Sequence, residues 1–241
     1  MKKFACTAII LSLLSLAGTA LGWHDKTHLT VAKVAKYPMW YNAAGPDIAK
    51  IKAGDVEGYN HWYNNNWKSE VTPQTVIKQI DRYNKSNVLI DIDGHLYGAI
   101  IAALREYEAS ITSGKYGEYH LVYCAHYIGD LSMPLHNVPY DDYNRNRHAV
   151  NDGIVDREVL AHPENIERHM YKITLRDNSF EDDLIREIVR IANISRRLGY
   201  KLQAENRNMT PEVILASYSR RAAIIAPYRC PSISISTFDL L

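Results

Sequence analysis

Apolar and polar residues along the chain repeat with the period of an α-helix almost throughout. Apolar side chains recur at intervals of three and four residues, and no run alternates convincingly with the two-residue period of a β-strand. The pattern predicts an all-α fold. The helices that it predicts cover residues 28–37, 73–83, 96–113, 116–132, 147–160, 180–198 and 211–226.

Capping and breaking residues support several of these helix ends. Thr72 is a typical N-cap with Pro73 at the first helical position, and Gly114 separates the two central helices. The stretch 43–67 contains glycines, a proline and a run of asparagines, so we predict short turns and loops there, where functional residues are often found. The end of the chain, 233–241, is consistent with either a short strand or an extended tail.

The beginning of the chain has the organisation of a cleavable signal peptide. It starts with two lysines, has an apolar middle over 8–17 and ends on small residues at 20–22. The apolar run is shorter than the roughly 20 residues that a membrane-spanning helix needs, which argues against the alternative of an uncleaved anchor. We therefore expect residues 1–22 to be removed, so that a mature chain beginning at Trp23 is periplasmic or secreted.

The mature part, 23–241, is long enough for one sizeable hydrophobic core, and no Pro/Ser/Gly-rich linker divides it, so we expect a single domain. Its two cysteines, Cys124 and Cys230, either form one disulfide in an oxidising compartment or remain as two buried thiols. The net charge of +1 gives no basic field of the kind that attracts phosphates, and it neither requires nor excludes a nucleic-acid substrate. No stable protein partner and no transmembrane segment are evident in this part of the chain.

The segment HYIGDLSMPLH, residues 126–136, has the spacing of a metal-binding sequence. His126 and Asp130 are four residues apart on a predicted helix, so both side chains project from one face, and His136 follows after Pro134 ends the helix. One such pair alone is most often a surface hydrogen bond. A second pair with the same spacing, His148 and Asp152, makes metal binding the better interpretation of both pairs. Histidine and carboxylate ligands without paired cysteines are typical of catalytic rather than structural zinc sites.

The N-terminal sequence WHDKTHL offers further ligands. A free α-amino group can donate its lone pair to a metal ion, and the carbonyl of Trp23 could complete the chelate once the signal peptide has been removed. His28 lies five residues further on. The alternative is that Trp23 is an apolar anchor of the core and His28 an ordinary helix residue.

Together these residues resemble the trinuclear zinc phosphodiesterases, which include fungal single-strand-specific nucleases and bacterial phospholipases C. The resemblance is loose over most of the mature chain and close in its motifs. The family pattern H-x-x-G-D-x-x-x-P-x-H is similar to residues 126–136, an H-x-x-x-D or H-x-x-x-E pair is similar to His148 and Asp152, and the processed N-terminal tryptophan that ligates in the family is similar to Trp23.

The resemblance implies three zinc ions bridged by Asp130. One would be held by Asp55, His61, His126 and Asp130, a second by His136, His148 and Asp152, and a third by Trp23, His28 and the other oxygen of Asp130.

Asp55 corresponds in this interpretation to the aspartate of the family's A-D segment. Its interval to His61 is shorter than in the family, and Asp47 is a competing donor. Asp91, Asp93 and His95 correspond to no family ligand, and we expect them to form a turn and the start of a helix.

The resemblance implies a hydrolase that cleaves phosphodiesters with a metal-activated water, with Asp55 and Asp130 as catalytic carboxylates. The short interval from Trp23 to His28 and the aspartate at position 152 favour a single-strand nuclease and 3′-nucleotidase. Glu57, by contrast, stands near the position of an arginine in that branch, so a phospholipase C acting on phosphatidylcholine-type lipids is the alternative.

Trp62 and Tyr63 are the candidate substrate-binding residues, because their rings could stack on a base or hold a choline-like cation. Two further classes of protein stay open, a periplasmic zinc-binding protein and a plain helical binding module. The first would usually carry a flexible His-rich tract, and none is present. The second leaves the spacing of the histidines and aspartates unexplained.

Overall fold

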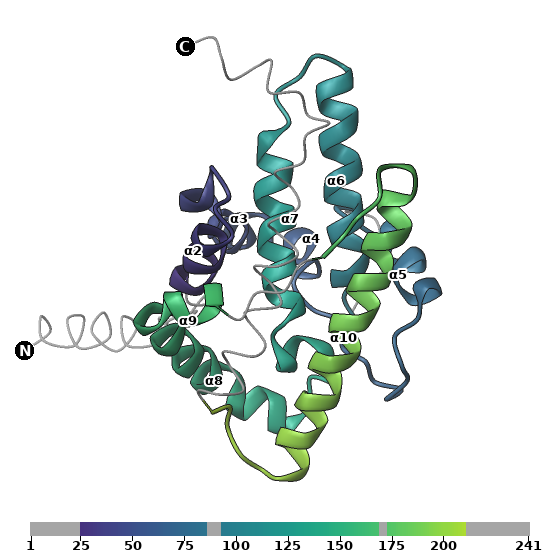
Figure 1. Cartoon of the computed structure of the whole chain (residues 1–241). Coiled ribbons are helices and arrows are strands. Elements are labelled where there is room, and N and C mark those ends of the chain that lie inside the picture. The colour runs from purple at the N-terminus through teal and green to yellow at the C-terminus, as the bar shows by residue number, and fades with distance from the viewer. Residues whose placement is uncertain (1–24, 86–92, 169–172, 211–241) are drawn as a thin grey trace, which may run out of the picture.

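Helices alone make up the regular secondary structure of residues 25–85, 93–168 and 173–210, the parts of the chain that the computed structural model describes (Figure 1). This confirms the predicted all-α fold. No helix in these ranges has both the length and the apolar character of a membrane span. The helices are α2 (Asp25–Val34), η1 (Trp40–Asn42), α3 (Gly45–Ala53), α4 (Asp55–Gly58), α5 (Pro73–Ile80), α6 (Leu96–Thr112), α7 (Glu118–Leu131), η2 (Pro134–Asn137), α8 (Asp142–Ala161), α9 (Pro163–Arg168), η3 (Asp177–Ser179) and α10 (Phe180–Ala204).

Several predictions concern residues outside the described ranges. These are the signal peptide 1–22, the ligand Trp23, the cysteine Cys230, the aspartate Asp91, the helix 211–226 and the end of the chain, 233–241.

Most predicted helices are present with boundaries shifted by a few residues. Thr72 caps α5 by accepting a hydrogen bond from the backbone N–H of Thr75, as its sequence position predicts. The prediction of loops only over 43–67 is wrong, because α3 and α4 lie there. Helix α8 begins before the predicted Arg147, because the Asp141 side chain accepts from the Asn144 N–H and caps an earlier turn. Helix α9 was not predicted.

Helices α6 and α7 form an antiparallel hairpin at the centre of the molecule (Figure 1). Their facing sides contribute many of the fully buried side chains, including Tyr97, Ile100, Tyr127 and Ile128. Burial of each such side chain stabilises the fold by roughly 1.5–3 kcal/mol before the loss of chain entropy is counted. Because α7 is held along its whole length, the side chains on its last turns have fixed directions.

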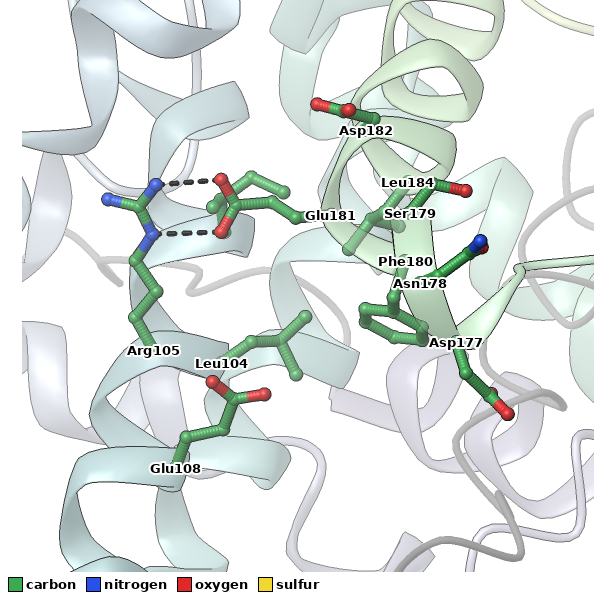
Figure 2. A pocket seen from close by; sticks show the side chains of 11 residues that line it. Leu104, Arg105, Glu108, Asp177, Asn178, Ser179, Phe180, Glu181, Asp182 and Leu184 are labelled. Atoms are coloured by element: carbon green, nitrogen blue, oxygen red, sulfur yellow. Dashed lines mark hydrogen bonds and ion pairs between the residues drawn. The ribbon is translucent and has the colours of Figure 1, made fainter.

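Helix α10 packs against this hairpin and against η2, which follows α7. At the start of α10, Glu181 accepts two hydrogen bonds from Arg105 of α6, from Nε at 2.9 Å and from Nη2 at 2.7 Å (Figure 2). A hollow of about 290 Å³ lies beside this pair, lined by residues of α6, η3 and the first turn of α10. The pair is exposed, so it orients the two helices more than it stabilises them.

A close contact with α10 sets the position of η2. A Cβ atom added at Gly199 would lie 2.8 Å from the backbone oxygen of Pro134 and 2.6 Å from a methyl group of Val138. The two backbones can approach each other this closely only because position 199 has no side chain. Gly199 therefore fixes the segment that carries His136.

We expect G199A to destabilise the protein although alanine favours helices more than glycine. The helix propensity gain is about 1 kcal/mol, whereas forcing a methyl group against the Pro134 backbone should cost about 1–3 kcal/mol or more. Urea unfolding would measure the difference. The exposed Lys201 on the same helix provides the control, since K201A should change the free energy of unfolding by no more than about 0.5 kcal/mol. Equal or greater stability of G199A would contradict the proposed contact.

Candidate metal centre

Asp130 lies at the centre of a buried group of histidines that come from four different parts of the chain. Its Oδ2 is 3.0 Å from His61 Nδ1 and 3.3 Å from His126 Nε2. Its Oδ1 is 3.3 Å from His136 Nδ1 and 3.5 Å from His28 Nε2. The carboxylate is fully buried. Each of its two oxygens thus faces a different pair of histidine nitrogens.

Local structure explains why these side chains meet. His126 and Asp130 are one turn apart on α7, as their spacing predicts, and Pro134 starts the short helix η2 that turns His136 back towards Asp130. Helix α2 is held against α8 by a buried hydrogen bond from Thr27 Oγ1 to Asp156. That contact places the next residue, His28, in a stack on His126 with ring centroids 3.7 Å apart.

Hydrogen bonds fix which nitrogen of three of the rings carries the proton. His126 donates its Nδ1–H to the Ala43 carbonyl at 2.7 Å, and His148 donates its Nδ1–H to Asn144 Oδ1 at 2.8 Å. His61 donates its Nε2–H to Glu57 at 3.3 Å. The opposite nitrogen of each neutral ring therefore carries a lone pair, which is the arrangement that metal-ligating histidines show.

The lone pairs of His61 and His126 point towards the same oxygen of Asp130. His61 Nδ1 and His126 Nε2 lie 3.2 Å apart, neither of these two nitrogens carries a proton when the rings are neutral, and both face Asp130 Oδ2. Asp47 adds its two oxygens at 3.7 Å, one to each of the two rings. Ligand atoms on a tetrahedral zinc ion at about 2.0–2.1 Å are roughly 3.3 Å apart. The spacing of His61, His126 and Asp130 therefore fits one metal ion, and Asp47 lies near both of the rings.

A second set of possible metal ligands lies next to the first. His136 Nε2 is 3.1 Å from His148 Nε2, the two rings are stacked, and His148 Nε2 is 3.7 Å from Asp152 Oδ2. His148 and Asp152 come from α8 at the four-residue spacing that the sequence showed. These three residues thus lie together, as predicted.

The carboxylates of the site have oxygens without hydrogen-bond donors. Both oxygens of Asp130, Asp47 Oδ2 and Asp152 Oδ1 are buried and accept no hydrogen bond. Burying carboxylate oxygens without a donor is costly unless a cation compensates. The buried histidine and aspartate groups can therefore hold a metal ion, and two overlapping groups meet the geometric requirement, His28 with His126 and Asp130, and Asp47 with His61 and His126.

The pKa values of the site reflect the same crowding. Burial raises the pKa of Asp152 well above its usual value, and the nearby Asp130 and Asp47 carboxylates raise it further. Burial lowers the pKa of His148 to about 3, with His136 as a second cause. For His61, burial lowers the pKa, but the nearby Asp130 and Glu57 carboxylates outweigh it and the net pKa is raised. A bound metal ion would compete with that proton.

The assignment of Asp55 to this site is corrected by the structure. Asp55 is the exposed first residue of α4, whereas the buried Asp47 lies in the first turn of α3 and contacts His61 and His126. Asp55 was chosen by its resemblance to the family's A-D segment, and the sequence did not predict α3, the element that turns Asp47 towards α7. Asp47, and not Asp55, is the aspartate that lies against His61 and His126.

Trp62 and Tyr63 are half-buried and have packing partners of their own. The Trp62 ring contacts Tyr59 edge to face at a centroid distance of 5.8 Å, and the Tyr63 ring packs on Tyr97 at 5.1 Å. The Tyr63 N–H also donates to the His136 carbonyl at 2.9 Å. Both residues therefore support the segment around the site. Their contact with a substrate stays a prediction.

Two other residues singled out by the sequence have structural positions. Cys124 is buried and its thiol lies 3.6 Å from the Ile100 carbonyl, so it packs the α6–α7 hairpin. Asp93 and His95 form the turn and the entry of α6, as expected, with Gly94 at a φ of 70°.

Sequence reasoning missed two residues beside the centre, Glu57 and Lys50. Glu57 lies four residues before His61, the same spacing that identified His126 with Asp130, so that signal was present in the sequence. Lys50 lies one turn after Asp47 on α3, and its Nζ donates to Asp47 Oδ1 at 2.9 Å.

We expect D47N to remove metal binding at the group that contains His61, whereas D55N should not. Loss of a ligand should weaken binding by more than the roughly 10–100-fold typical of residues that only orient ligands. Isothermal titration with zinc and metal analysis after dialysis would measure the change. Equal losses in the two variants would contradict the placement of Asp47 in the site.

Comparison of the chain with protein-family models, with curated proteins and with solved structures gave no significant match.

Proposed function

We propose that the protein is a zinc-dependent phosphodiester hydrolase, most similar in activity to a single-strand nuclease and 3′-nucleotidase. The observation that carries this proposal is the buried Asp130, whose two oxygens face two different sets of histidine nitrogens. A carboxylate shared in this way suits neighbouring metal ions, and closely spaced metal ions are a recurrent solution for phosphodiester hydrolysis.

The proposed ligand sets follow the sequence interpretation with one change. The first contains Asp47, His61, His126 and Asp130, the second His136, His148 and Asp152, and the third His28, Asp130 and the N-terminal Trp23, which lies outside the described residues. Histidine nitrogens with carboxylate oxygens favour zinc over magnesium or calcium, which prefer oxygen ligands alone.

When bound, zinc supplies a water of lowered pKa for attack on phosphorus and neutralises charge that develops on the phosphate oxygens. The protein's own residues hold the ligand side chains in place and orient them. Ala43, Asn144 and Glu57 fix the ring orientations of the three histidines described above, so the donors need little rearrangement. The burial of Asp130 and His126 excludes bulk water from their side of the site.

Lys50 is the side chain proposed to contact the substrate phosphate. The arginine expected shortly after the family's aspartate is absent after Asp55, but with Asp47 as the ligand, Lys50 is the cation three residues further on. Its side chain is 28% exposed, so its ammonium group can face both Asp47 and an anion arriving from solvent. This arrangement favours the nuclease over the phospholipase.

The phospholipase C alternative is supported by a different observation, the exposed apolar side chains beside α3. Tyr41, Ile48 and Tyr119 are between 48% and 61% exposed and line a hollow of about 280 Å³ at the start of α3 and α7. Exposed apolar side chains gathered on one face are suited to a lipid aggregate. A periplasmic zinc-binding protein is less well supported, because most of the proposed metal ligands lie on helices and are buried.

We expect zinc analysis of the mature protein to find three ions per chain and chelation to abolish hydrolysis. Parallel assays with single-stranded DNA or RNA, 3′-nucleotides and phosphatidylcholine would then identify the substrate class. D130N should lose both metal and activity because it removes the shared carboxylate. Absence of bound zinc from the wild-type protein would refute the proposed function, and hydrolysis of phosphatidylcholine alone would select the alternative.

We expect K50A to lower kcat by about 100–1,000-fold if the ammonium group stabilises charge on phosphate, as removal of one such donor does elsewhere. K50R should keep most of the activity because it keeps the charge. K52A, at an exposed position of the same helix, is the matched control and should behave as the wild type. Steady-state kinetics with zinc content measured in each variant would separate this role from metal loss. Full activity of K50A would exclude Lys50 from the reaction.

A further inference from the structure

Glu57 is a buried carboxylate next to the candidate metal centre that belongs to none of the proposed ligand sets. Only 3% of the residue is exposed, and its Oε1 lies 3.3 Å from His61 Nε2. This contact is on the side of the ring opposite to Nδ1, which faces Asp130 and His126. The His61 ring thus lies between Glu57 and the proposed metal ligands Asp130 and His126.

Its hydrogen bonds separate Glu57 from the carboxylates that are suited to binding metal. Oε1 accepts from the Tyr127 hydroxyl at 2.7 Å as well as from His61, and Oε2 accepts from Asn60 Nδ2 at 3.1 Å. Asp47 and Asp130, by contrast, have buried oxygens that accept no hydrogen bond. A carboxylate whose two oxygens both accept hydrogen bonds is held in place by them. Carboxylate oxygens that accept no hydrogen bond, by contrast, are available to bind a cation.

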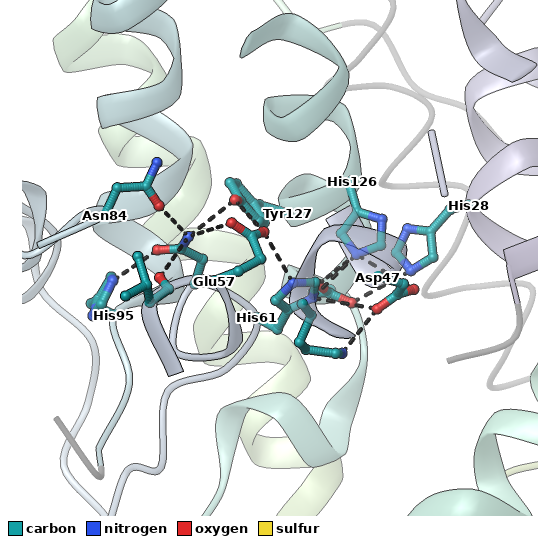
Figure 3. A network of polar contacts seen from close by, with 12 residues as sticks. His28, Asp47, Glu57, His61, Asn84, His95, His126 and Tyr127 are labelled. Carbon is teal, nitrogen blue, oxygen red and sulfur yellow. Dashed lines mark hydrogen bonds and ion pairs between the residues drawn. The ribbon is translucent and has the colours of Figure 1, made fainter. Parts of the chain in front are cut away.

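A polar network surrounds this carboxylate (Figure 3). Asn60 Nδ2 also lies 3.1 Å from the Tyr127 hydroxyl and 3.0 Å from Asn84 Oδ1, and Asn60 Oδ1 lies 2.8 Å from His95 Nε2. The network therefore extends from the N-cap of α6 through α4 and the residues after it to Tyr127 of α7. It gives His95, which the sequence analysis left without a ligand role, a place in the support of His61.

We propose that Glu57 is a positioning residue that holds His61 with its Nε2–H hydrogen-bonded and its Nδ1 lone pair directed at the metal ion bound with Asp47, His126 and Asp130. The carboxylate fixes the tautomer and the ring orientation, and its negative charge makes the imidazole a stronger donor. This inference rests on the proposed metal binding, but it adds a residue that the ligand sets do not contain.

The competing explanation is that Glu57 only ties α4 to α7 through Tyr127. In that case, loss of the carboxylate would lower stability without changing the affinity of the site for metal. Tyr127 provides the matched comparison, because Y127F breaks the hydrogen bond to Glu57 and leaves the contact between Glu57 and His61 in place.

Zinc titration of the mature protein and of these two variants tests the proposal. E57Q keeps the size of the side chain and removes its charge, and it should weaken zinc binding at this group by about 10–100-fold, the range for residues that orient a ligand. Y127F should lower the free energy of unfolding but keep the zinc affinity within about threefold. E57Q with wild-type affinity, or Y127F with an equal loss, would overturn the positioning role.

A second measurement needs no variant and so does not depend on the folding of E57Q. Nitrogen-15 NMR of zinc-loaded wild-type protein with labelled histidines should show His61 with a protonated, hydrogen-bonded Nε2 and a metal-bound Nδ1. A metal-bound Nε2 would overturn the proposal even though zinc is bound. If the wild-type protein binds no zinc, the proposed function itself fails, so the two failures are distinguishable.

Discussion

Lone pairs directed at one another inside a protein are unfavourable, and the centre of this molecule contains several of them. His61 Nδ1, His126 Nε2 and Asp130 Oδ2 lie 3.0–3.3 Å apart, while the protons of both rings are used elsewhere, on Glu57 and on the Ala43 carbonyl. A positive charge at this point, either a metal ion or a proton on His61, whose pKa the Asp130 and Glu57 carboxylates raise, makes such an arrangement favourable. The ends of α2, α3 and α7 and the placement of η2 are best understood as the framework that brings these atoms together and keeps water away from them.

The helical framework serves this purpose through short-range geometry. The four-residue spacing places His126 beside Asp130 and His148 beside Asp152 without any long-range requirement. Long-range packing then has only to bring whole helices together, which the buried residues of the α6–α7 hairpin and the Gly199 contact achieve. A shift of one helix would displace both ligands that it carries, so the site depends most on how the helices are placed relative to one another.

Much of this could be predicted from the sequence because periodicity and ligand spacing are local properties. The all-α fold was predicted correctly, and His28, His61, His126, Asp130, His136, His148 and Asp152 do lie together in the structure. Asp47 was only an alternative, because the resemblance to the family's A-D segment pointed to Asp55. The glycine and proline at 45 and 46 indicate a turn, whereas here they occupy the first turn of α3. Proline is compatible with that position because the first N–H groups of a helix have no partner within the helix.

The hydrogen bonds that orient the rings could not be predicted in the same way. The acceptor for His126 is a backbone carbonyl, that of Ala43, and its position depends on how the segment before α3 packs against α7. Glu57 has the right spacing to His61, but only the burial of both side chains distinguishes an orienting carboxylate from a surface pair. Tertiary packing decides such contacts, and no local pattern records it.

The donors around Asp130 come from α2, α3, α7, η2 and α8, so segments that are far apart in the sequence end at one point. A bound ion would therefore act as a cross-link as well as a reagent, closing long loops between the beginning and the middle of the chain. Cross-links of this kind reduce the entropy of the unfolded chain, and the effect grows slowly with the length of the loop that they close. Metal loss would accordingly loosen the attachment of α2 and make this part of the chain easier for proteases to cleave.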